Sequence, residues 1–288
     1  MINTLVLSGC CYNILDMYGA IYHLVKEKYI CYDNIKHIYG TSGGSIIGLA
    51  ILLKMNEDDI FKYMHERPWD ELTESSSFSI NKKGVFNKDF FRIMIEPILK
   101  SKYLTIHTTL AELYIKTDIV FNIVTVKLDD MTPVLKNYKT DQDLTILDAI
   151  YMSSAIPYLF EPLKYNNTYY IDGGICCNFP IEYCIKDNIK SENILGIKTQ
   201  ADTNFSKANI DDLSLFTYFA YISRQFINKI YDITNRSDYT DYKIIRLRIK
   251  EQTTEEGIII CKDKAKRLKY LNNGIEIAKE FLKHSCEI

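Results

Sequence analysis

The chain has 288 residues, of which 47% are hydrophobic and 25% are charged, a balance typical of a folded globular protein and not of a disordered tail or a coiled coil. This length accommodates one large α/β domain or two small domains. The net charge of −2 gives no overall attraction toward polyanions, so we expect no nucleic-acid partner.

The beginning of the sequence does not look like a secretion signal, because it lacks a basic start and soon meets Gly9 and Asp16. The longest apolar run, residues 46–53, is too short to cross a bilayer. We therefore expect a soluble, cytoplasmic protein, or one that is at most peripheral to a membrane. Eight cysteines without a secretion signal favour reduced thiols over a disulfide framework, and the adjacent pairs at 10–11 and 176–177 lack metal-site spacing.

The first elements alternate between strand and helix. Residues 3–7 have the pattern of a buried strand, and residues 14–25 have the spacing of an amphipathic helix. A second strand is expected over 35–39, followed by a glycine-rich turn and an apolar helix that reaches Leu53. This alternation predicts a parallel sheet covered by helices on both faces, with ligands at the carboxyl ends of the strands.

The middle of the chain contains clear start and stop signals. Thr109 and Glu112 form a capping box at the start of a short helix. Proline disfavours helical geometry in the residue before it, so the Glu96-Pro97 step should bend or end its helix. The expected elements are helices over 56–67, 87–99, 109–115 and 144–154, a polar loop over 71–79, a hairpin over 119–138 and a short strand over 168–171.

The last third continues without a linker. We expect a helix that starts at Pro180, strands over 194–198 and 242–249, and an amphipathic helix over 262–283. A long helical segment over 211–231 carries an aromatic face that favours core packing over membrane docking. The prediction is a single α/β domain over 1–288 with three αβα layers and a mostly parallel central sheet.

A G-x-S-x-G motif, Gly40-Thr41-Ser42-Gly43-Gly44, lies between the second expected strand and its helix. A serine on such a turn is held with its hydroxyl exposed above the sheet, and the glycines let the turn close. The start of the helix also favours a developing oxyanion. The motif predicts Ser42 as a nucleophile; the alternative is a glycine-rich turn with an incidental serine.

A serine hydroxyl is a poor nucleophile unless a base removes its proton. None of the five histidines stands in a turn motif or beside a glycine-rich loop. Asp172-Gly173-Gly174, by contrast, places a carboxylate at the end of a strand with two glycines that let other groups come close. We predict Asp172 as the base of a Ser–Asp dyad, which depends on a desolvated site with good hydrogen bonding.

The residues around these motifs resemble the patatin-like phospholipase family. The resemblance rests on Ser-Ser-Ala-Ile-Pro-Tyr-Leu-Phe-Glu-Pro at 153–162, Tyr-Tyr-Ile-Asp-Gly-Gly at 169–174 and Asn-Phe-Pro at 178–180, and it extends from residue 5 to about 195. That family pairs a G-x-S-x-G serine with the aspartate of a D-G-G or D-G-A motif and uses no histidine. The resemblance implies a patatin-like fold, Ser42 as nucleophile, Asp172 as general base and no metal or organic cofactor. It also implies a phospholipid or another acyl lipid as substrate, met at a membrane surface.

The loop after the first strand departs from the family pattern. Family members usually carry G-G-G-x-R/K-G there, and its backbone N–H groups hold the oxyanion. The matching residues 9–14 keep only the first glycine, and Asn13 cannot supply the charge of the missing basic residue. By the resemblance, the expected oxyanion donors are the backbone groups of Gly9, Cys10, Cys11, Tyr12 and Gly43.

These observations favour a serine lipid acyl hydrolase of phospholipase A type. The altered loop motivates a first alternative, a catalytically weak lipid-binding or regulatory member of the family. A second alternative is an α/β-hydrolase esterase with a triad of Ser42, Asp172 and His284, which is less favoured because His284 lies near the end of an expected helix. The oligomeric state, the lipid head group and the choice between the sn-1 and sn-2 esters stay open.

Overall fold

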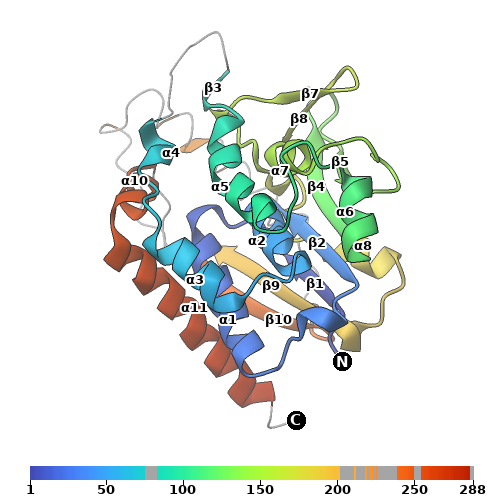
Figure 1. Ribbon diagram of the computed structural model, residues 1–288, viewed down its shortest axis with the longest axis vertical. Helices are drawn as coiled ribbons and strands as arrows, with labels where there is room; N and C mark the ends of the chain where they lie inside the picture. The colour runs from blue at the N-terminus through green and yellow to red at the C-terminus, as the bar shows by residue number, and fades with distance from the viewer. Residues whose placement is uncertain are drawn as a thin grey trace.

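The computed structural model describes residues 1–74, 83–201, 239–249 and 254–285, with a few isolated positions between 211 and 225. Within these residues a mixed eight-stranded sheet runs through the centre of the molecule in the order β10-β9-β1-β2-β4-β8-β7, with β5 also paired to β4 (Figure 1). The strands are β1 (Thr4–Leu7), β2 (His37–Thr41), β4 (Val120–Lys127), β5 (Pro133–Lys136), β7 (Leu163–Tyr165), β8 (Thr168–Asp172), β9 (Ile194–Ala201) and β10 (Lys243–Ile249).

Neighbouring strands from β10 to β4 pair in parallel, whereas β5 and β8 are antiparallel to β4. The register along β4 explains how two distant segments meet. Thr41, the last residue of β2, pairs with Val124, and Asp172, the last residue of β8, pairs with Thr125. Because β5 pairs with residues 123–126 along the other edge of β4, β2 and β8 lie along the same edge, and their carboxyl ends meet there.

Helices cover both faces of the sheet (Figure 1). Side chains alternate along a strand, so Leu5 and Leu7 pack with α1 and α2, whereas Val6 and Tyr39 pack with Ile181 of α8 on the other face. The predicted α/β architecture with a mostly parallel sheet is thus confirmed. The helices are α1 (Ile14–Lys26), α2 (Gly43–Leu52), α3 (Glu57–Glu66), α4 (Glu71–Glu74), α5 (Asp89–Lys100), α6 (Leu110–Thr117), α7 (Ile146–Ser154), α8 (Ile181–Lys186), α10 (Thr254–Lys262) and α11 (Lys264–Ser285).

The C-terminal helix α11 lies against α1, as the red and blue helices at one side of Figure 1 show. Glycines allow the two backbones to approach closely. A Cβ atom on Gly19 would stand 2.0 Å from the carbonyl oxygen of Leu271, and one on Gly274 would stand 1.9 Å from that of Asp16. In the first turn of α11, the buried guanidinium of Arg267 donates to backbone carbonyls, among them that of His65. The C-terminal helix is therefore tightly built into this face of the fold.

Most predicted elements are confirmed, with ends that differ by a few residues. Of the two outcomes expected at Pro97, a bend or an end of the helix, the end was wrong, because α5 continues through Pro97 to Lys100. Proline leaves the carbonyl of Ile93 without its helical donor, and Nη1 of Arg67 supplies a replacement at 2.9 Å. The capping box of α6 is present as predicted.

The polar loop expected over 71–79 was wrong in its first part, since residues 71–74 form α4 with Leu72 buried. The rest of that loop lies outside the described residues, as does most of the helix expected over 211–231. The sequence analysis missed α10 and three strands of only three residues each: β7 and the pair formed by β3 (Gly84–Phe86) and β6 (Tyr158–Phe160). No helix in the described part of the chain is both long enough and apolar enough to span a bilayer.

Candidate active site

Ser42 occupies the turn between β2 and α2, with φ of 51° and ψ of −124°. A positive φ is uncommon for a residue with a side chain, and strained residues of this kind cluster at functional sites. The turn is closed from within, because the backbone N–H and the hydroxyl of Ser45 both donate to the Ser42 carbonyl, at 2.8 and 2.6 Å. Gly40 permits this closure, since a Cβ there would stand 2.8 Å from Cα of Ser45.

Two further contacts fix the turn in the fold. The backbone N–H of Ser42 donates to Oγ of Ser153 on α7 at 2.8 Å. Gly44 presses against the end of β1, where a Cβ atom would stand 2.4 Å from the carbonyl oxygen of Leu7. The strand, turn and helix predicted around the G-x-S-x-G motif are therefore present, whereas the expected exposure of the serine is not, since Ser42 is only 6% exposed.

Asp172 lies at the end of β8, beside this turn. Its backbone N–H donates to the carbonyl of Ala155 at 3.0 Å, and its Oδ1 accepts the backbone N–H of Gly174 at 2.5 Å. Gly173 is needed for the close turn, because a Cβ there would stand 2.4 Å from the carbonyl oxygen of Val124. The structure thus gives both glycines of the Asp-Gly-Gly motif a specific part in placing the carboxylate.

Asp172 lies next to the Ser42 turn, because Asp172 and Thr41 pair with the adjacent residues Thr125 and Val124 of β4. Burial raises the pKa of Asp172 from its ordinary value of 3.8 to about 7, against the N–H of Gly174 and the Ser42 hydroxyl, which both lower it. The two predicted catalytic residues are therefore brought together in a desolvated environment. His284 is not part of this arrangement: it is exposed on the last turn of α11, with Nδ1 2.7 Å from the carbonyl oxygen of Glu280.

The loop after β1 passes directly beside Ser42. A Cβ atom on Gly9 would stand 3.3 Å from Cβ of Ser42 and 2.3 Å from Oδ1 of Asn178. The N–H of Gly9 donates to the Asn178 carbonyl at 3.0 Å, and the Gly9 carbonyl accepts from Nδ2 of Asn178 and from the Thr199 hydroxyl. This corrects one expected oxyanion donor: the N–H of Gly9 is engaged within the protein, and Gly9 instead provides space.

The next residues bring the loop onto the start of α2. A Cβ atom on Gly43 would stand 2.6 Å from Sγ and 3.8 Å from the backbone N of Cys10. Cys11 has a positive φ of 46°, the kind of backbone for which family members carry glycine, and it begins the 3₁₀ turn η1 (Cys11–Asn13). Burial raises the pKa of the Cys10 thiol well above its ordinary value, and the charges of Cys11, Asp16 and Asp172 add to this effect. Cys10 is therefore a buried neutral thiol that packs against Gly43.

Three site residues had no role in the sequence analysis: Ser153, Asn178 and Thr199. Ser153 and Asn178 belong to the segments that carried the family resemblance, so their signal was present without a function attached to it. Thr199 lies on β9, where its hydroxyl reaches the Gly9 carbonyl at 2.7 Å. A strand threonine carries no local sign that it will contact a loop 190 residues away.

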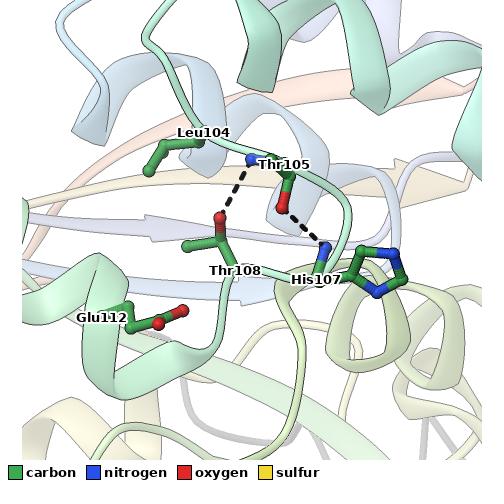
Figure 2. A pocket seen from close by; sticks show the side chains of 5 residues that line it. All are labelled: Leu104, Thr105, His107, Thr108 and Glu112. Atoms are coloured by element: carbon green, nitrogen blue, oxygen red, sulfur yellow. Dashed lines mark hydrogen bonds between the residues drawn. The ribbon is translucent and has the colours of Figure 1, made fainter.

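A surface depression of about 330 Å³ lies away from the dyad, where the connection after α5 enters α6 (Figure 2). Neither Ser42 nor Asp172 lines it. Its polar groups are engaged locally, because the N–H of Thr105 donates to the Thr108 hydroxyl at 3.0 Å and that of His107 donates to the Thr105 hydroxyl at 3.2 Å. The carboxylate of Glu112 accepts the backbone N–H of Thr109 in the capping box. The polar groups that line the depression therefore serve a turn and the N-terminal cap of α6, and we assign no binding site to this depression.

The chain is similar to several known proteins. A family model described as patatin-like phospholipase matches residues 5–185. "Probable lipid hydrolase 463L" of Invertebrate iridescent virus 6 is 32% identical over 214 residues, which cover 69% of this chain and 71% of that protein. "Uncharacterized protein R571" of Acanthamoeba polyphaga mimivirus is 29% identical over 277 residues, covering 89% and 91% of the two chains. Among solved structures, VipD from Legionella pneumophila superposes with a TM-score of 0.57 at 16% identity, over 98% of this chain and 67% of that one, a likeness that shows the fold alone.

Proposed function

The chain belongs to the patatin-like phospholipase family, and from this membership we propose that it is a lipid acyl hydrolase of phospholipase A type that uses a Ser42–Asp172 dyad. The viral relative is named a probable lipid hydrolase, which supports a lipid as the substrate class. The observation that carries the proposal is the meeting of the Ser42 turn and the buried Asp172 carboxylate where β2 and β8 end along β4. We propose fatty-acyl esters of phospholipids, met at a membrane surface, as the substrates.

In the proposed reaction, Oγ of Ser42 attacks the carbonyl carbon of the ester while Asp172 takes the hydroxyl proton. A carboxylate with a pKa of about 7 is a stronger base than an ordinary aspartate and is still substantially ionised at neutral pH. Asp172 then returns the proton to the leaving alcohol, which departs as the lysophospholipid. Water attacks the acyl-serine with Asp172 again as the base, and the fatty acid is released.

The oxyanion of each tetrahedral intermediate needs backbone donors close to Ser42. Gly43 starts α2, where helix N–H groups lack partners inside the helix and the dipole favours negative charge. We propose that this end of α2 and the adjoining backbone of Cys10, Cys11 and Tyr12 form the oxyanion site. The close packing of Cys10 on Gly43 supports this assignment.

The loop also supports a second candidate function. The N–H of Gly9 is engaged by Asn178, and the side chain of Asn13 donates to Asp16 at 2.7 Å, so neither matches the glycine-rich, basic loop of the family. A lipid-binding protein with weak catalysis would follow if too few donors faced the oxyanion. Removing one oxyanion donor typically lowers the rate by about a hundred- to a thousandfold.

Fatty-acid release from phospholipid vesicles and from a soluble p-nitrophenyl ester tests these functions. We expect Ser42→Ala and Asp172→Asn each to lower kcat by about a thousandfold or more, with His284→Ala equal to wild type. A fluorophosphonate should label Ser42 in wild type and fail to label the Asp172→Asn variant at a comparable rate. Loss of activity in His284→Ala would instead indicate a triad. A wild type that binds vesicles but hydrolyses neither ester would favour the lipid-binding function.

A further inference from the structure

A network of side-chain hydrogen bonds connects the C-terminal helix to the loop after β1. Asp16, in the first turn of α1, is 1% exposed, and both of its carboxylate oxygens accept from side-chain amides. Oδ2 accepts from Nδ2 of Asn13, the last residue of η1, at 2.7 Å. Oδ1 accepts from Nδ2 of Asn273 on α11, also at 2.7 Å. One buried carboxylate thus joins a loop residue to a helix 257 residues away.

The backbone around Asn13 links the contact between Asn13 and Asp16 to the conformation of the loop. The N–H of Asn13 donates to the carbonyl of Cys10 at 2.9 Å, which closes a tight turn over Cys11 with its positive φ. Cys10 in turn packs on Gly43 beside Ser42. A positive φ is uncommon for a residue with a side chain, and contacts from the surrounding structure help to hold it. The amide of Asn13, held by Asp16, provides such support from the side of the loop that faces α1.

The crossing of α11 and α1 fixes the Asn273 end of this hydrogen-bond network. A Cβ atom on Gly274 would stand 1.9 Å from the backbone carbonyl of Asp16, so α11 contacts α1 at the residue that carries the carboxylate. Asn273 is the neighbour of Gly274, and its amide reaches Asp16 from this crossing. Hydrogen bonds to a charged group are stronger than those between neutral groups, and a buried carboxylate depends on them.

We propose that Asp16 is a positioning residue for the oxyanion loop, and that Asn273 of the C-terminal helix acts through it. This inference rests on the proposed function of the Ser42 site. It assigns a part in catalysis to a helix outside the residues that match the family model. Where family members use glycines and a basic residue, this chain fastens the loop through Asn13, Asp16 and Asn273. None of the three needs to touch the substrate.

The test removes one end of this hydrogen-bond network with Asn273→Leu and uses Asn272→Leu as a matched control, because both asparagines are exposed neighbours on the same helix. A second variant, Asp16→Asn with Asn273→Asp, moves the carboxylate to position 273. It keeps both contacts, because the amide at position 16 can accept from Asn13 and donate to the new carboxylate. The measurements are kcat and KM on a soluble p-nitrophenyl ester, together with the alkylation rates of Cys10 and Cys184 read by mass spectrometry.

Alkylation reports the loop independently of catalysis, because Cys10 is 3% exposed and becomes reactive only when the loop opens. Cys184 is fully buried in the core on the other face of the sheet and reports general loosening of the fold. We expect Asn273→Leu to raise the Cys10 rate and lower kcat, each by roughly tenfold, with KM changed by less than about threefold. Cys184 should stay protected, Asn272→Leu should equal wild type, and the exchanged pair should regain most of both losses.

The outcomes separate this inference from the proposed function. Unchanged kcat and unchanged Cys10 alkylation in Asn273→Leu would overturn the positioning role. Equal gains in reactivity at Cys10 and Cys184 would also overturn it, since they would show a loss of overall stability. If wild type hydrolyses no ester, the proposed function fails, and the Cys10 rate alone then decides whether Asn273 holds the loop.

Discussion

The turn that carries Ser42 and the loop that follows β1 lie side by side, yet they are held in different ways. The turn is closed mainly by its own residues, with Ser45 bonded to the Ser42 carbonyl and Gly40 leaving the space. The loop is held from far along the chain, by Asn178 at 169 residues from Gly9 and by Asn273 at 257 residues from Asp16. A site can therefore combine one part that is specified locally with another that exists only when the whole chain has folded.

The largest expected effect comes from breaking the boundary between the two regions with Gly44→Ala. The new Cβ would meet the carbonyl oxygens of Leu7 and Ser8 at 2.4 and 2.6 Å, and backbone atoms of a central strand cannot move away. We expect a loss of about 4 kcal/mol in the free energy of unfolding and about a thousandfold in kcat. Urea unfolding and ester hydrolysis measure the two effects.

Gly257→Ala is the matched control for this prediction. Gly257 lies within α10, where a Cβ atom would meet only the ring of Tyr12 at 3.6 Å, an ordinary contact. Alanine favours a helix over glycine by roughly 1 kcal/mol, so this variant should be as stable as wild type or slightly more stable. A Gly44→Ala protein that behaves like Gly257→Ala would show that the turn and β1 are not pressed together.

The pH dependence tests the carboxylate that faces both regions. Because burial raises the pKa of Asp172 from 3.8 to about 7, the folded protein holds a proton there between these values that the unfolded chain has lost. The protonated Asp172 carboxyl therefore makes its full contribution to the free energy of unfolding below about pH 4. This contribution is lost as the pH rises through 7, which lowers the free energy of unfolding by up to roughly 4 kcal/mol. Catalysis needs the ionised form, so kcat/KM should rise about tenfold per pH unit and level off above pH 7.

Asp172→Asn removes the titrating group while keeping an oxygen for the N–H of Gly174. Its free energy of unfolding should be less dependent on pH between 5 and 8 than that of wild type, as measured by urea unfolding at several pH values. A wild-type kcat/KM that is flat over this range would contradict a buried base at the site.

The contrast between the turn and the loop also explains what the sequence could predict. Five consecutive residues around Ser42, together with the patterns before and after them, were enough to predict a strand, a turn and a helix. The path of α5 through Pro97 was not predictable, because Arg67, just beyond the end of α3, donates to the carbonyl of Ile93 that the proline leaves without its helical donor. The role of Asn13 was likewise hidden, since its partner Asp16 is held by Asn273. Contacts between distant segments leave no periodic pattern in the sequence.

A more moderate effect should follow when the long-range support is disturbed without touching the site. In Gly274→Ala, the new Cβ would stand 1.9 Å from the Asp16 carbonyl, so α11 and α1 must separate. We expect a loss of about 2–3 kcal/mol in stability, with Cys10 alkylated faster than in wild type. Thermal unfolding and mass spectrometry provide the readouts. A stable variant with protected Cys10 would show that the loop does not depend on this helix crossing.

The smallest expected effect comes from Ser153, a distant residue whose hydroxyl accepts the backbone N–H of Ser42. Ser153→Ala leaves the buried N–H of Ser42 without its acceptor, which should cost about 1–2 kcal/mol in stability and roughly tenfold in kcat. Ser154→Ala is a close control, because among the described residues the Ser154 hydroxyl is buried without a hydrogen-bond partner, so its removal should be neutral or slightly stabilising. Equal behaviour of the two variants in urea unfolding and ester hydrolysis would mean that the turn maintains its strained serine entirely by itself, and the contrast with the neighbouring loop would then be sharper still.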